Sequence, residues 1–150
     1  MLEVERAADL KAYEGKEIGV SDWYIVTQEQ IDKFADATGD HQWIHVDVER
    51  ATKELGAPIA HGYLILSIIP FLARNIIGYK GIGRFLNYGC NKVRFANVVP
   101  VGKRIRLQLK LLNVEQRGAG LQITSQCTVE IEGEERPACV AETVAVAYPE

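Results

Sequence analysis

The sequence has few of the residues that build disulfide frameworks or metal sites. Its three cysteines (Cys90, Cys127 and Cys139) are widely spaced and form no CxxC pair, which argues against both a disulfide framework and a zinc site. We therefore expect reduced thiols. His41, His45 and His61 could be imagined around a metal, but the first two fall in an expected loop and no acidic partner recurs at a regular spacing. We expect no metal.

Other absences exclude further classes of protein. The formal net charge is −3, without the clustered basic excess that a nucleic-acid surface needs. The longest apolar stretch, residues 63–73, is too short to span a bilayer, and the acidic N-terminus does not resemble a signal peptide. Residues 81–83 form no dinucleotide fingerprint, and no GxSxG motif occurs. We expect a cytoplasmic protein with no cofactor, no nucleic-acid partner and no membrane partner.

What is present describes an ordinary globular domain. The chain has 150 residues, of which 47% are hydrophobic and 25% charged, which fits one domain over residues 1–150. Its apolar residues recur with a helical period before about residue 80 and alternate as in strands after it. Helices followed by strands favour an α+β protein with an antiparallel sheet curled round a buried helix.

The first half predicts a short strand and three helices. The strand covers residues 23–26, and the first helix follows from Thr27, with Gln30 completing a capping box, to Gly39. A second helix covers 47–56, with Asp47 as its cap. The third runs from about residue 61 to 77 and is apolar nearly all round, as in a core helix, with a kink expected at Pro70.

The second half predicts antiparallel strands with one buried face. Apolar and polar residues alternate over residues 105–111 and 121–131, and further strands are expected at 85–95 and 140–148. Hairpin turns are expected at the glycines of this region, which are Gly118, Gly120 and Gly133.

Residues 36–51 carry the first candidate chemistry, between two predicted helices. Asp40 and His45 lie five residues apart and could converge from a loop on one water molecule. A carboxylate and an imidazole can supply the base and the acid that hydration of a double bond requires. Alternatively, Asp40 is a turn residue that satisfies its own backbone and His45 is a packing residue.

A second candidate segment begins the third helix. Gly62 lets a ligand approach the backbone, and N–H groups of a first helical turn have no helical acceptor, so they could polarise a thioester carbonyl. Alternatively, Gly62 only permits close packing and His61 is a cap residue. Asn87 and Asn91 share one parity of a strand, which suggests either a pocket wall or an edge facing water. As hypotheses, we assign His61, Asn87 and Asn91 to substrate binding.

These segments together resemble a known family. Phe34-Ala-Asp-Ala-Thr-Gly-Asp40-His-Gln-Trp-Ile-His45, followed by Ala60-His61-Gly62, is similar to the hydratase motif of MaoC-like dehydratases. The triplet 42–44, where many members have Asn-Pro and an aliphatic residue, and the segment 86–95 resemble the branch related to the nodulation protein NodN.

The resemblance implies a hot-dog fold, in which an antiparallel sheet wraps one long helix, and a homodimer that joins two sheets. It also implies (R)-specific hydration of trans-2-enoyl-CoA thioesters to (R)-3-hydroxyacyl-CoA. Asp40 and His45 become the acid–base pair, and Gly62 becomes the oxyanion donor through its N–H. The absence of Asn-Pro leaves open the family's finer contacts around the acid–base pair and its preferred acyl chain length, but it removes neither Asp40 nor His45.

Other functions remain open on the sequence. A hot-dog thioesterase would use a carboxylate and a polarised carbonyl but would release free CoA. A dehydratase acting on acyl carrier protein would be favoured by a basic docking patch. A non-catalytic acyl-CoA-binding subunit would need no intact Asp40–His45 pair, and a structural dimerisation domain would leave both residues unexplained.

Overall fold

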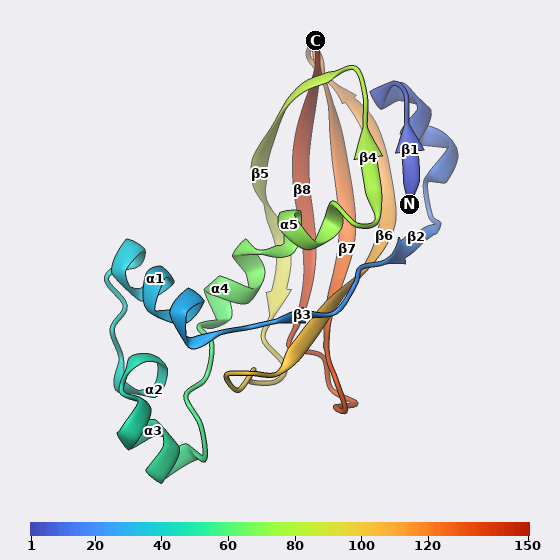
Figure 1. Cartoon of the computed structure of the whole chain (residues 1–150). Coiled ribbons are helices and arrows are strands. Elements are labelled where there is room, and N and C mark those ends of the chain that lie inside the picture. Colours follow the sequence, from blue (N-terminus) through green and yellow to red (C-terminus); the bar gives the residue numbers. More distant parts are fainter.

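Four long strands from the second half of the chain make up most of the main sheet. The computed structural model describes residues 1–150, and its strands run side by side in Figure 1. They are β5 (Ile82–Arg94), β6 (Arg104–Arg117), β7 (Gly120–Ile131) and β8 (Cys139–Pro149). Every neighbouring pair in the order β2-β6-β7-β8-β5 is antiparallel, and the short β3 (Tyr24–Ile25) also pairs with β6. The predicted strands are thus confirmed.

Alternation along these strands gives the sheet one buried face. In β6, residues 105, 107, 109 and 111 are buried, while the intervening Arg104 and Arg106 pair with Glu132 and Glu130 on the outer face. Burying each such aliphatic side chain contributes about 1.5–3 kcal/mol. The inward residues of β8 are small, including Ala141 and Ala147, which leaves room for a helix to approach the sheet.

The third predicted helix is two short helices. They are α4 (Gly62–Ser67) and α5 (Ile69–Ala73), separated at Ile68. The break has a physical cause, because Pro70 has no N–H to donate and falls in the first turn of α5, where none is needed. The predicted end at Ile77 was wrong, since Ile77 begins strand β4 (Ile77–Tyr79). One face is also open, with Tyr63 and Phe71 exposed.

Helices α1 (Gln28–Thr38), α2 (Trp43–Val46) and α3 (Val48–Leu55) form a lobe beside the sheet (Figure 1). Both predicted caps are present, but the capping box expected at Thr27 is only half formed, because the Gln30 side-chain oxygen has no hydrogen-bond partner. The Thr27 hydroxyl accepts from the Gln30 N–H at 3.2 Å, and the Asp47 carboxylate accepts from the Arg50 N–H at 3.1 Å. Gly39 closes α1 with a left-handed φ of 84°. The helical turn α2 was not predicted, because four residues carry too little periodicity.

The N-terminal segment was also not predicted. Strand β1 (Leu2–Val4) pairs in parallel with β4, a 3₁₀ helix covers Ala7–Tyr13, and β2 (Glu17–Val20) lies along β6. Pairing with β1 explains why Ile77 leaves the helix: its backbone groups are satisfied by a segment more than seventy residues away in sequence.

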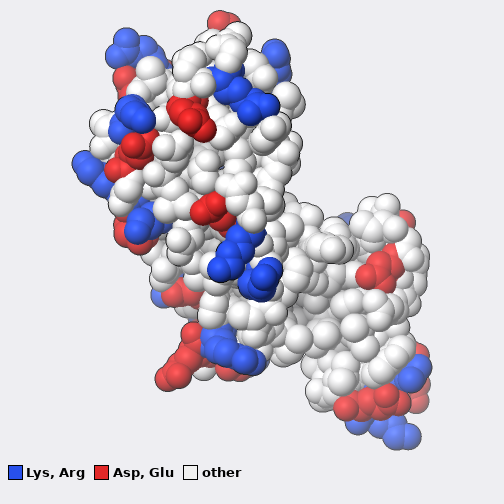
Figure 2. All heavy atoms as spheres, turned by 180° about the vertical axis from the view of Figure 1, so that it is seen from behind, with Lys and Arg blue, Asp and Glu red and all other residues white.

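A curled antiparallel sheet with helices across its inner face is the hot-dog fold, and the predicted α+β class is confirmed. In Figure 2, Lys and Arg alternate with Asp and Glu over the main body, and the smaller helical lobe projects from it. No helix is both long enough and apolar enough to cross a membrane.

Candidate active site

A hollow of about 300 Å³ opens where the helical lobe meets the start of α4. It brings together segments of α1–α2, α4 and the residue that follows β5. Its lining residues are Asp40, His45, His61, Gly62, Tyr63 and Phe95. Four of the six predicted site residues therefore gather at one place, although up to 22 positions separate them in sequence.

Hydrogen bonds hold both the ring and the backbone of His45 in place. This residue lies on α2 and is 6% exposed. Its Nδ1 lies 2.7 Å from the carbonyl oxygen of Ile59, and its own carbonyl accepts from the Gln28 side-chain amide at 2.8 Å. A carbonyl oxygen only accepts, so Nδ1 carries the hydrogen and Nε2 of the neutral ring is an acceptor. The backbone thus fixes the tautomer of His45.

Asp40 follows the left-handed Gly39, which turns the chain out of α1. Its carboxylate accepts from the Gln42 N–H at 3.4 Å. Partial desolvation opposes ionisation, but the hydrogen bonds from Gln42 and the nearby His45 and His61 outweigh it and hold the pKa of Asp40 below its usual value. Asp40 and neutral His45 are then both acceptors, an arrangement that can hold a water molecule by both of its hydrogens.

His61 lies beneath the pair and is 3% exposed. Its Nε2 donates to the backbone carbonyl of Asp40 at 2.9 Å. Its ring stacks on that of His45, with ring centroids 3.8 Å apart and ring planes inclined by 21°. The ring of Phe34 also packs against the His61 ring, with centroids 4.9 Å apart. The Nδ1 of His61 is buried without a hydrogen-bond partner within the chain.

Asp40, His45 and His61 each offer one possible metal-ligand atom, and these atoms lie within 4.8 Å of one another. The nitrogen lone pairs of an imidazole lie in the ring plane. In two stacked rings the planes run almost parallel, so the lone pairs do not meet at the ~2.0–2.1 Å that a zinc ion requires. The stack in this geometry fits a metal poorly.

Phe95 approaches Gly62 closely. A Cβ atom on Gly62 would lie 3.0 Å from the Cγ of that ring, tighter than nine in ten real Cβ contacts, so the ring or the backbone would have to shift. The Gly62 N–H stands at the first position of α4, where no helical acceptor exists. Because α4 has only six residues, the N–H itself and not a long helix dipole is what this end can offer a ligand.

The structure does not bring Asn87 and Asn91 to the hollow. Both are exposed on β5, and the Asn91 amide donates to the Glu142 carboxylate at 2.7 Å. The register of β5 against β8 shifts at residues 88 and 91, so the regular alternation on which their common parity was expected is interrupted between them. His41 also points elsewhere, with Nε2 2.9 Å from the Asp36 carboxylate.

Sequence reasoning did not assign several groups that shape the site. Phe95 and Tyr63 line the hollow with rings 5.8 Å apart, and Gln28 and the Ile59 carbonyl hold His45. Phe95 ends the strand that the sequence predicts over residues 85–95, and its place at the end of that strand was a weak signal for it. A backbone carbonyl leaves no signal in sequence.

Comparisons with known proteins agree on one family. Residues 9–133 match the family described as MaoC like domain. The chain is 51% identical to the 3-hydroxyacyl-thioester dehydratase Z of Mycobacterium tuberculosis over 142 residues, covering 93% of this chain and 94% of that protein. It is 44% identical to nodulation protein N of Rhizobium leguminosarum, covering 93% and 89%. An R-hydratase structure from Pseudomonas aeruginosa superposes with a TM-score of 0.74 at 20% identity, covering 96% and 86%.

Proposed function

The chain belongs to the MaoC-like dehydratase family and is an enzyme of its hydratase and dehydratase class, and we propose that its reaction is the reversible addition of water to trans-2-enoyl-CoA, giving (R)-3-hydroxyacyl-CoA. The relative with 51% identity is named for a 3-hydroxyacyl-thioester, which supports a thioester as substrate. The observation that carries the proposal is the presence of two acceptors, Asp40 and His45, beside the unpaired N–H of Gly62 in one hollow.

The chemistry follows from these groups. A water molecule donates one hydrogen to the Asp40 carboxylate and the other to Nε2 of His45, which raises the electron density on its oxygen. The oxygen attacks C3 of the enoyl group, and the electron pair of the double bond moves to the thioester oxygen. The Gly62 N–H stabilises that oxyanion by a hydrogen bond formed more strongly in the transition state.

The proton balance constrains the last step. In the tautomer of His45 that has its hydrogen on Nδ1, neither Asp40 nor His45 holds a hydrogen toward the hollow, so the proton added to C2 is the one taken from water. Whichever member of the pair accepts it also returns it, and the pair acts as one coupled unit. In the reverse direction the same group removes the C2 proton and protonates the departing hydroxyl.

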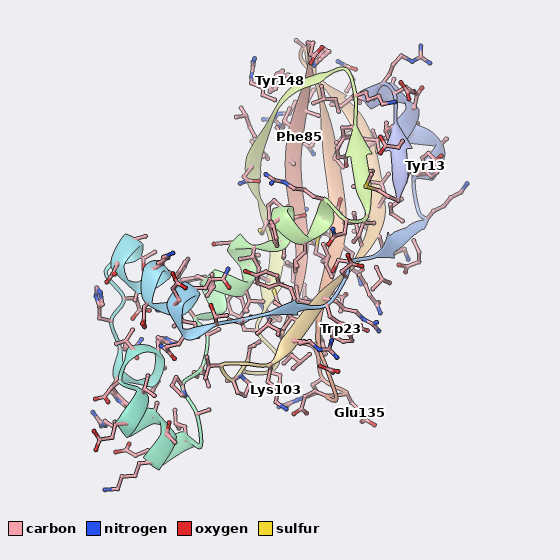
Figure 3. All side chains as sticks on the ribbon, in the orientation of Figure 1. Tyr13, Trp23, Phe85, Lys103, Glu135 and Tyr148 are labelled. Atoms are coloured by element: carbon pink, nitrogen blue, oxygen red, sulfur yellow. The ribbon has the colours of Figure 1, made fainter.

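We also propose that the enzyme is a homodimer joined through β5. This strand is outermost in the sheet order, has 13 residues and is exposed on both faces. A long unpaired edge carrying exposed Phe85, Leu86 and Tyr88 is rare unless another chain covers it. Figure 3 labels Phe85 on this side of the sheet, away from Tyr13.

The deciding experiment mixes the purified protein with crotonyl-CoA and follows loss of the conjugated enoyl-thioester absorbance. We expect the absorbance to fall and the product to be (R)-3-hydroxybutyryl-CoA. The proposal fails if folded protein leaves both crotonyl-CoA and longer enoyl-CoA esters unchanged. Release of free CoA from a saturated acyl-CoA would indicate a thioesterase. A strong preference for an enoyl group attached to acyl carrier protein would show that this protein, and not CoA, carries the substrate.

A further inference from the structure

The His61 side chain contacts both members of the proposed acid–base pair, and although it lines the hollow it is only 3% exposed. Its ring lies against His45, its Nε2 holds the carbonyl of Asp40, and its remaining ring nitrogen is buried. Its own carbonyl accepts from the N–H groups of Leu64 and Ile65 at 3.0 and 3.3 Å, which starts α4. The Gly62 N–H is part of the peptide bond between His61 and Gly62, so His61 is linked directly to the proposed oxyanion donor.

We propose that His61 is a positioning residue that locks the acid–base pair to the oxyanion donor, and that it does not bind the substrate. This inference rests on the proposed hydratase function. Both ring nitrogens are withdrawn from a ligand, because Nε2 is already bonded and Nδ1 has no accessible surface. What His61 fixes is the distance between Asp40, which follows α1, and His45, which lies on α2.

Two properties of one side chain are needed for this role. The N–H at Nε2 prevents the Asp40 turn from moving away, and the flat ring sets the plane in which His45 directs its free Nε2. Phe34 packs on His61 at 4.9 Å and keeps the ring from tilting. A phenylalanine could stack but could not donate, and a glutamine could donate but could not stack.

These differences define the test. His61→Phe keeps the stack and loses the hydrogen bond, His61→Gln keeps a donor and loses the stack, and His61→Ala loses both. We expect the first two to lower kcat for crotonyl-CoA by about 10- to 100-fold with little change in KM, since small displacements of reacting groups cost that much. His61→Ala should be lowest, and His41→Gln, a histidine outside the hollow, should match the wild type.

Two results would overturn the inference. One is a raised KM with unchanged kcat in His61→Phe and His61→Gln, which would make His61 a substrate contact. The other comes from the wild type and needs no folded variant: ¹⁵N NMR of labelled histidines should find the hydrogen of His61 on Nε2 and that of His45 on Nδ1, and the opposite tautomer at His61 contradicts the lock. The NMR result stands even if crotonyl-CoA is not hydrated, so failure of the function and failure of the lock are distinguishable.

Discussion

The ring of Phe95 occupies the space where a side chain on Gly62 would begin, 3.0 Å from the ideal Cβ position. Phe95 directly follows β5, while Gly62 begins α4, so this contact fixes the distance between the sheet edge and the proposed oxyanion donor. A ring is too rigid to yield as a flexible side chain would.

We therefore expect Gly62→Ala to lower kcat/KM for crotonyl-CoA by about 10- to 100-fold, because the ring or the helix start must shift. Phe95→Leu added to Gly62→Ala should restore part of the rate by giving back space. Steady-state kinetics of the four proteins in a double-mutant cycle measure this coupling. Additive effects of the two substitutions would show that the contact does not matter to the reaction.

The acid–base pair gives the second prediction. Asp40→Asn and His45→Gln should each reduce hydration by about 10²–10⁴-fold, the usual contribution of a general acid or base. Thermal unfolding should change little for Asp40→Asn, whose side chain makes only a long hydrogen bond to Gln42. His41→Gln serves as the matched histidine control and should retain full activity. Unfolding of both site variants would instead favour a structural role for the pair.

The ion pair of His41 with Asp36 gives a prediction on pH. The hydrogen bond from His41 to Asp36 outweighs partial desolvation and raises the pKa of His41 above its ordinary value. A raised folded-state pKa means that the pair stabilises the fold below the unfolded pKa and that this contribution disappears as the pH rises through the folded pKa. Because both groups are exposed, the effect on stability is small.

The measurement is an NMR titration of the His41 ring in the wild type and in Asp36→Asn. The midpoint should fall in the variant. The melting temperature of Asp36→Asn should lie below the wild type at about pH 5 and match it at about pH 9, on either side of the ordinary histidine range. A variant deficit that persists at high pH would mean that Asp36 stabilises the fold by some other route.

Much of the fold could be predicted because its signals are local. Thr27 and Asp47 accept from backbone N–H groups three residues away, so the start of a helix is encoded within one turn. Strands β6 and β7 alternate over the paired residues 105–111 and 125–131 because one face of the sheet is buried, and a register shift after Leu111 ends the regular pattern. The end of the central helix could not be predicted, since Ile76 and Ile77 are as apolar as a buried helix and only pairing with Leu2 makes Ile77 a strand residue.

The candidate site divides in the same way. Asp40, His45 and Gly62 stand in a recognisable order of residue types, so sequence could nominate them. The contact of His61 with the Asp40 carbonyl joins residues 21 positions apart through a backbone atom, and backbone atoms are the same at every residue. Asn87 and Asn91 were nominated on strand parity, a regular alternation that register shifts in β5 interrupt, and their role in substrate binding stays a prediction.

The exposed edge of β5 gives the last prediction, on assembly. Leu86 is 50% exposed near the middle of this edge, and Val20 is 48% exposed on β2 at the opposite edge of the sheet. If two copies pair their β5 strands about a twofold axis, Leu86→Asp puts an unpaired charge from each copy into a desolvated contact, whereas Val20→Asp stays in water.

Light scattering coupled to gel filtration should therefore give a dimer for the wild type and for Val20→Asp, and a monomer for Leu86→Asp. Hydration should fall with dissociation, because Phe95 lines the hollow and continues directly from β5, so freeing the strand loosens a wall of the site. A wild-type monomer that is fully active would refute the dimer and leave the exposed row of Phe85, Leu86 and Tyr88 as a surface for a different partner.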